Sequence, residues 1–137
     1  MLRTMGWLAM AFVLFAPGAK GQSTRAGGEP TFQDRPLSAW VQDLKAPAPY
    51  TRNAAAYAIS SMGPAAKSAV PALIATLDDP AAAVRFPVAY ALGEIGPDAI
   101  AAVPALTKAM DDVNDDVAFM ARKAIKKITG TAPEPPQ

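Results

Sequence analysis

The segment "GPAAKSAVPAL" occupies residues 63–73, and the closely similar "GPDAIAAVPAL" occupies residues 96–106. The similarity extends beyond these segments, because the sequence from Arg52 overlays the sequence from Arg85 when it is shifted by 33 residues. Nearly half of the overlaid residues are identical, more than an alanine-rich composition alone would produce. A fixed period of this length is typical of a protein built by stacking one structural unit.

Each copy has the pattern of two helices. Apolar residues recur every three or four positions in the first half of the second copy: Val84, Val88, Leu92 and Ile95. This spacing places them on one helical face. Gly96 and Pro97 should end that helix, because glycine suits the left-handed C′ position and proline cannot continue the turn. A second helix should follow, with Pro104 in its first turn, where a missing N–H costs little.

The junctions between copies carry further signals. Asp79 and Pro80 are expected to start the next first helix as N-cap and N1 residues. Pro87 lies inside that helix, and it disfavours the α conformation for Phe86 before it, so the helix is expected to start late or to kink. Weaker half copies precede and follow the two clear ones. The expected second helices are Leu37–Leu44, Val70–Leu77 and Val103–Met110.

The pattern "RxxxAYALGEIGPxAxxAVPALxxxMDD" at residues 85–112 resembles the HEAT repeat, and more narrowly the short bacterial HEAT-like class first associated with phycobilisome lyases. The resemblance covers residues 36–130. It implies an all-α fold, a short right-handed αα solenoid of about six helices. It also implies a non-catalytic scaffold that binds another protein. The alternative it leaves open is a helper subunit of an enzyme complex, as in bilin-lyase-like HEAT proteins.

The resemblance also implies a ladder of contacts between units. HEAT units often carry an aspartate in the loop and an arginine six residues later, as Asp79 and Arg85 do here. The other two copies depart from this pattern, because Ala46 and Ala118 stand where an aspartate and an arginine would be. The ladder is therefore expected to be incomplete at both ends.

Composition excludes several classes of function. The chain has no cysteine and no histidine, so disulfides, thiol nucleophiles, imidazole metal ligands and a Ser-His-Asp triad are impossible. Its 13 basic and 12 acidic residues form no broad basic field of the kind that nucleic-acid binding requires. Taken together with the HEAT resemblance, which implies a non-catalytic scaffold, these exclusions lead us to expect no enzyme, no cofactor, no metal and no nucleic-acid partner. An end-to-end homo-oligomer stays open, because three helix pairs are near the lower limit for such an array.

The N-terminus has the pattern of an export signal. Arg3 precedes the uncharged apolar run 5–16, and small residues at 19 and 21 suit cleavage after residue 21. An uncleaved anchor is the alternative, but twelve apolar residues are short for a membrane span of about 20. We expect a signal peptide at 1–21, a periplasmic or secreted protein, and no stable membrane insertion after cleavage. A flexible linker is expected at 22–35, and a Pro-rich disordered tail at 131–137.

Four groups of side chains have both a structural and a functional interpretation. The acidic cluster can cap a helix or bind Ca²⁺ weakly, and the basic cluster can form a solvated end cap or a phosphate patch. Trp40 aligns with Leu73 and is expected in the core at the N-terminal end. The recurring Tyr57 and Tyr90 are either structural or an aromatic stripe. The acidic cluster consists of Asp111, Asp112, Asp115 and Asp116. The basic cluster consists of Arg122, Lys123, Lys126 and Lys127.

The second helices offer a candidate binding face. In HEAT-type stacks these helices line the concave side, and the 33-residue shift aligns their non-core positions in rows. The rows are Ala39, Ala72 and Ala105; then Gln42, Ala75 and Lys108; then Asp43, Thr76 and Ala109. Because most of these residues are small, a partner backbone or helix could approach closely. The alternative is that the alanines only favour helix formation and close packing.

Overall fold

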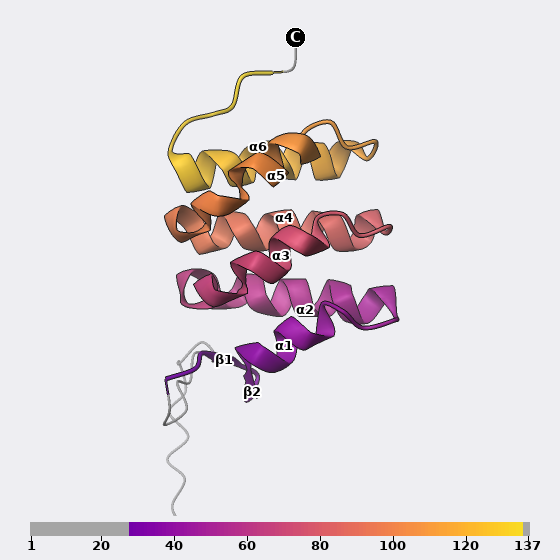
Figure 1. Cartoon of the computed structure of the whole chain (residues 1–137), viewed down its shortest axis with the longest axis vertical. Helices are drawn as coiled ribbons and strands as arrows, with labels where there is room; N and C mark the ends of the chain where they lie inside the picture. The colour runs from indigo at the N-terminus through magenta and orange to yellow at the C-terminus, as the bar shows by residue number, and fades with distance from the viewer. Residues whose placement is uncertain (1–27, 136–137) are drawn as a thin grey trace, which may run out of the picture.

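A computed structural model describes residues 28–135, so the expected signal peptide and residues 22–27 lie outside the described part. The described chain is a stack of helices in two layers, with α1, α3 and α5 in front of α2, α4 and α6 in Figure 1. This confirms the expected all-α solenoid. The helices are α1 (Leu37–Asp43), α2 (Pro49–Met62), α3 (Val70–Thr76), α4 (Ala82–Ile95), α5 (Val103–Ala109) and α6 (Asp115–Thr129). None of the described helices is long and apolar enough to cross a membrane.

The repeated Gly-Pro ends the long helices by a different route from the expected one. Gly63 and Gly96 have positive φ, but their ψ values of −138° and −144° lie outside the left-handed helical region. This part of conformational space is almost exclusive to glycine. Each glycine then opens a short 3₁₀ helix, η1 (Gly63–Ala69) or η2 (Gly96–Ala102), before the next α-helix begins. The repeated segment is therefore a 3₁₀ connection that leads into α3 and α5.

The expected N-cap at Asp79 is wrong. The N-cap of α4 is Ala81, and its first helical residue is Ala82. The Asp79 carboxylate instead accepts a hydrogen bond of 3.0 Å from the Ala81 backbone N–H. The same carboxylate also binds the Arg52 guanidinium, which holds Asp79 two residues before the N-cap. Its side chain therefore stabilises the turn before the helix.

The expected late start of the helix at Pro87 is also wrong. Helix α4 runs from Ala82 to Ile95 with Pro87 inside it. Proline lacks the N–H that would bind the carbonyl four residues earlier, which is that of Ala83. The Asn53 side chain of α2 donates to this carbonyl instead, with an Nδ2–O distance of 2.5 Å. A neighbouring helix thus satisfies the group that proline leaves free.

The core lies between the two layers and continues through all three helix pairs. Leu73 and Leu106, the equivalent residues of α3 and α5, are both fully buried. In the second layer, a Cβ atom on Gly93 of α4 would lie 3.1 Å from the Cα atom of Ala124 in α6. Small residues thus let the long helices pack closely, as the composition suggested.

A β-hairpin covers the N-terminal end of the stack. Its strands are β1 (Thr31–Phe32) and β2 (Arg35–Pro36), joined by two residues with positive φ. Trp40 of α1 packs on this hairpin, with its ring 6.3 Å from that of Phe32 and its indole N–H donating to the Phe32 carbonyl. The segment expected to be a flexible linker therefore ends in ordered structure. Trp40 is only partly buried and closes the end of the core.

Candidate protein-binding surface

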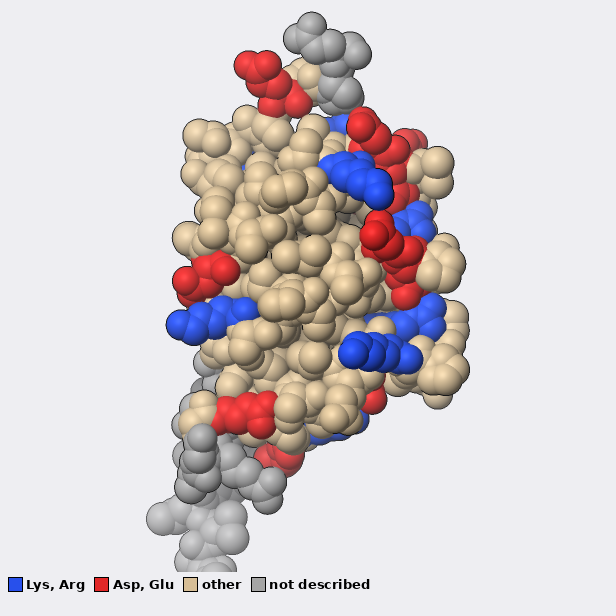
Figure 2. All heavy atoms as spheres, viewed as in Figure 1, with Lys and Arg blue, Asp and Glu red and all other residues tan. Residues whose placement is uncertain are grey.

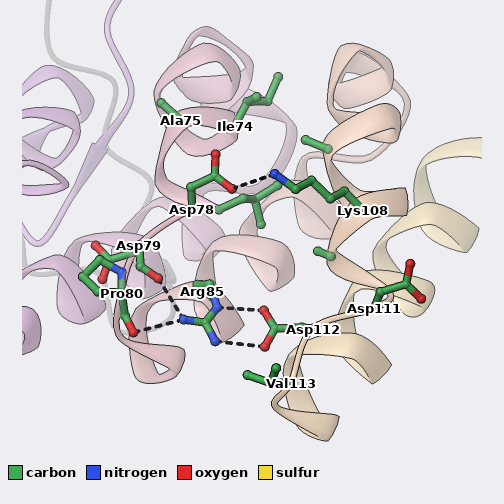
Figure 3. Close-up of a pocket in the computed structure, with 13 residues that line it drawn as sticks. Ile74, Ala75, Asp78, Asp79, Pro80, Arg85, Lys108, Asp111, Asp112 and Val113 are labelled. Carbon is green, nitrogen blue, oxygen red and sulfur yellow. Dashed lines mark hydrogen bonds and ion pairs between the residues drawn. The ribbon is translucent and has the colours of Figure 1, made fainter.

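Two hollows lie on the face formed by α1, α3 and α5, which we call the α1/α3/α5 face. The larger, of about 570 Å³, lies between α3 and α5, and Figure 3 shows its lining residues. The smaller, of about 260 Å³, lies between α1 and α3. Figure 2 shows that the middle of this face is largely uncharged, whereas charged residues gather along the edge formed by the loops between the layers.

Six of the nine residues predicted for the binding face line these hollows. Ala75 lines both of them. The other five divide between the two: Ala72 and Thr76 line the smaller, and Ala105, Lys108 and Ala109 line the larger. Thr76 is nearly buried, and its hydroxyl donates to the Ala72 carbonyl at 2.7 Å. Ala75 and Lys108 are exposed.

The three predicted residues of α1 lie apart from both hollows. Ala39 is half-buried and Gln42 is exposed. Asp43 forms an ion pair with Arg35 of the hairpin, at 2.5 Å between Oδ2 and Nη1. The Arg35 guanidinium also lies 4.4 Å from the centroid of the Trp40 ring. The hairpin therefore engages Asp43 at the end of the array, where the repeat pattern alone suggested a free surface.

The edge of the larger hollow is held by a ladder of arginine–aspartate pairs. Arg85 of α4 binds Asp112 with two hydrogen bonds, of 2.7 Å from Nε and 2.9 Å from Nη2. Its Nη1 donates to the Asp79 carbonyl at 2.8 Å, as Figure 3 shows. Arg52 of α2 binds Asp79 in the same bidentate way, at 2.6 and 3.0 Å. Bidentate pairs of this kind fix orientation as well as distance.

The expectation of an incomplete ladder is therefore wrong at its N-terminal end. Each arginine takes its carboxylate from the following unit, 27 residues later, and not from its own loop. Arg52 needs no aspartate at position 46, because it uses the backbone carbonyl of Ala46 there, as Arg85 uses that of Asp79. Both junctions between successive units thus carry the same pair.

The ladder lowers the pKa values of its two carboxylates, Asp79 and Asp112. Burial of Asp79 disfavours its charged form, but hydrogen bonds from Arg52 and the Ala81 N–H outweigh it and lower the pKa of Asp79. The hydrogen bond from Arg85 lowers the pKa of Asp112, against a smaller opposing effect of burial. Both carboxylates therefore stay charged at neutral pH and hold the loops at the rim.

Sequence reasoning predicted Lys108 but missed the other residues of the outer rim of the larger hollow. Asp78 and Lys108 face each other across it, 3.8 Å apart, and both side chains are largely exposed. Asp111 and the highly exposed Val113 extend the rim toward α6. The signal for this rim was present, because the pair Asp78-Asp79 recurs at 111–112. One aspartate of each pair binds arginine, and the other faces solvent.

The acidic cluster has mainly a structural role in this arrangement. Asn114 is the N-cap of α6, and its side chain accepts hydrogen bonds from the N–H groups of Asp116 and Val117. Asp115 and Asp116 lie in the first turn, and lysines lie in the last turn, so both ends complement the helix dipole. Among residues 28–135, no three acidic side chains are grouped as a metal site would require.

Comparisons with known proteins agree with this geometry. Residues 37–126 match the family described as HEAT repeats. The chain is also similar to a solved structure of an engineered protein from the Northeast Structural Genomics Consortium, with 24% identity and a TM-score of 0.60. That match covers 69% of this chain but only 45% of the engineered protein, and at this identity it concerns the fold alone. The comparison with curated proteins finds no match. The family match spans most of the chain, including all but the last turn of α6, and the chain belongs to the HEAT-repeat family.

Proposed function

We propose that this protein is a non-catalytic scaffold that binds another protein across the α1/α3/α5 face. HEAT repeats generally mediate contacts between proteins. The observation that carries the proposal is the pair of adjoining hollows that share Ala75. Their floors hold alanines, which let a partner backbone or helix approach closely, and their rims hold charges that can set its orientation.

We also propose that the protein acts outside the cytoplasm, in the periplasm or as a secreted protein. The support is the sequence pattern of residues 1–21, which lie outside the described part of the chain. Nothing in the proposed binding mode needs a reducing compartment, because the chain has no cysteine.

A single bulky charge on the face tests the binding surface. Ala75→Arg places a long cation between the two hollows, and arginine has a helix propensity close to that of alanine. Ala54→Arg is the matched control, because Ala54 is an exposed helical alanine on α2, in the other layer. We expect both variants to keep the circular dichroism and melting of the unsubstituted protein. The unsubstituted protein and Ala54→Arg should retain the same partner in a pull-down, and Ala75→Arg should lose it.

Two results would contradict this assignment. If Ala75→Arg unfolds the protein, position 75 is packed and the surface is misplaced. If Ala75→Arg folds and still retains the partner, the contact lies on another face. The identity of the retained protein also separates a general scaffold from a helper subunit, because a helper would retain an enzyme.

A further inference from the structure

We propose that the other layer carries a second docking surface, which fits an extended proline-rich peptide with a basic residue at one end. The surface is a groove of about 620 Å³ lined by residues of α2, α4 and α6 or their N-terminal turns. We call it the aromatic groove and define it by Asn53, Tyr57, Phe86, Asn114, Asp116 and Phe119. It lies on the layer opposite the α1/α3/α5 face, so it does not depend on the function proposed for that face.

The aromatic rings of this groove are available to a ligand. Tyr57 is 42% exposed and Phe119 is 54% exposed, although both lie on helices that pack against the core. Phe86 and Phe119 occupy the same position of successive units, so their rings come from neighbouring helices in register. The Tyr57 ring is held against that of Tyr90, with centroids 6.4 Å apart. Tyr57 is therefore placed before any ligand arrives, which lowers the entropic cost of binding.

The spacing of the helices suits a polyproline II peptide. Packed helices lie about 8–10 Å apart, depending on the side chains between them. A polyproline II helix rises about 3.1 Å per residue with three residues per turn, so the same side of it recurs about every 9.3 Å. A peptide that crosses α4 and α6 would present one proline to Phe86 and another to Phe119. On α2 the equivalent position is Asn53, and the Tyr57 ring, four residues later, would flank the other end of the peptide. About seven residues would span the groove.

Charge favours one kind of end residue. Asp116 is the sole charged residue among those that line the groove. It is exposed and has no ion pair within residues 28–135. Farther along α6, the Lys123 ammonium lies 5.2 Å from the centroid of the Phe119 ring. The α2 part of the lining is uncharged, so a basic end residue is attracted toward the α6 end of the groove, and Lys123 confines it to the part of α6 near Asp116. This gives the peptide a direction.

Labelled synthetic peptides test the proposal with the purified protein. The probes are fluorescein-labelled RPPAPPAPPA and APPAPPAPPR, which place the arginine at either end, and the control RGGAGGAGGA. We expect saturable binding by fluorescence anisotropy for one orientation of the proline peptide, and none for the glycine control. Phe119→Ala and Tyr57→Ala should each weaken binding about tenfold, because each removes one stacking ring. Asp116→Asn should weaken it about threefold and reduce its dependence on salt.

The control variant is Ile100→Ala, which removes an exposed apolar side chain outside the groove and should bind like the unsubstituted protein. Ala75→Arg should also bind normally, which separates this surface from the α1/α3/α5 face. Equal binding of the glycine peptide, no saturation, or unchanged binding by Phe119→Ala would overturn the proposal. So would sedimentation that shows a dimer which Phe119→Ala dissociates, because a second copy would then occupy the groove.

Discussion

The hydrogen bond between Asn53 and Ala83 makes a quantitative prediction about Pro87. Asn53 donates to the Ala83 carbonyl at 2.5 Å because Pro87 has no N–H to offer it. Replacing Pro87 by alanine supplies that N–H from within α4. The Asn53 side chain then has no unsatisfied carbonyl to bind. Its contribution to the free energy of unfolding should therefore depend on the residue at position 87.

The size of this coupling follows from the exposure of the contact. Ala83 is exposed and Asn53 is half-buried, so water can replace the lost donor in part. A net value of about 1 kcal/mol is therefore expected for the bond, within the usual range of 0.5–1.5 kcal/mol. In a domain of this size that equals roughly 4–8 °C in Tm. In the Pro87→Ala background, Asn53→Ala should lack this cost.

A double-mutant cycle isolates the coupling from other effects. Changes in helix propensity at 53 and in packing around the fully buried Pro87 occur in both backgrounds and cancel. Urea unfolding of the four proteins should give a coupling of about 1 kcal/mol. A control cycle with Tyr50→Ala, on the same helix but highly exposed, should be additive. If the cost of Asn53→Ala is equal with proline and alanine at 87, the contact does not compensate for the proline.

Three further predictions concern the core, the ladder and the leader. Leu73→Ala and Leu106→Ala should each destabilise the fold by about 2–5 kcal/mol because both residues are fully buried; if thermal melts show either no more harmful than Ile100→Ala, the repeat register is wrong. Because the pKa values of Asp79 and Asp112 are lowered in the folded state, their contribution is complete above the ordinary carboxyl pKa of about 3.9 and is lost as pH falls through the folded values. The urea concentration at half unfolding should thus decrease when the pH is lowered below about 4. The double variant Asp79→Asn with Asp112→Asn should show a weaker dependence of this concentration on pH, and an unchanged dependence would argue against the ladder. Finally, protein recovered from the periplasm or medium should have the intact mass of residues 22–137, and a mass that includes residues 1–21 would refute cleavage.

Local pattern predicted the helices well because their causes are local. The expected second helices Leu37–Leu44, Val70–Leu77 and Val103–Met110 agree with α1, α3 and α5 to within one residue. Apolar spacing and Gly-Pro signals act over a single turn, so the chain states them directly. The 3₁₀ character of η1 and η2 was missed, because the same Gly-Pro signal ends a helix without specifying the conformation of the residues after it.

Contacts between units could not be predicted from the sequence in the same way. The partner of Arg85 lies 27 residues later, at Asp112, whereas the resemblance pointed to an aspartate within the same unit. The Asn53–Ala83 bond likewise depends on how α2 packs on α4. Such pairs are set by the offset between stacked helices, which the repeat period does not give.

The candidate face was predicted where the array is regular and missed where it ends. Rows drawn by the 33-residue shift located Ala75 and Lys108, because α3 and α5 repeat the same surroundings. The corresponding residues of α1 have different surroundings. The hairpin precedes α1, whereas a long helix precedes each of α3 and α5. Arg35 of that hairpin pairs with Asp43, and no periodic rule foresees it.

The residues at the C-terminal end of the stack bear on whether a further unit could stack on α6. Ala56 and Ala89 are fully buried where one long helix packs on the next, and the third occurrence of this position is Arg122. Similarly, Gly93 packs tightly against α6, and its counterpart in α6 is the exposed Lys126. A further unit stacked on α6 would have to bury two cations, and burial of unpaired charges is strongly unfavourable. End-to-end association through α6 is therefore opposed at the same positions that drive stacking inside the chain.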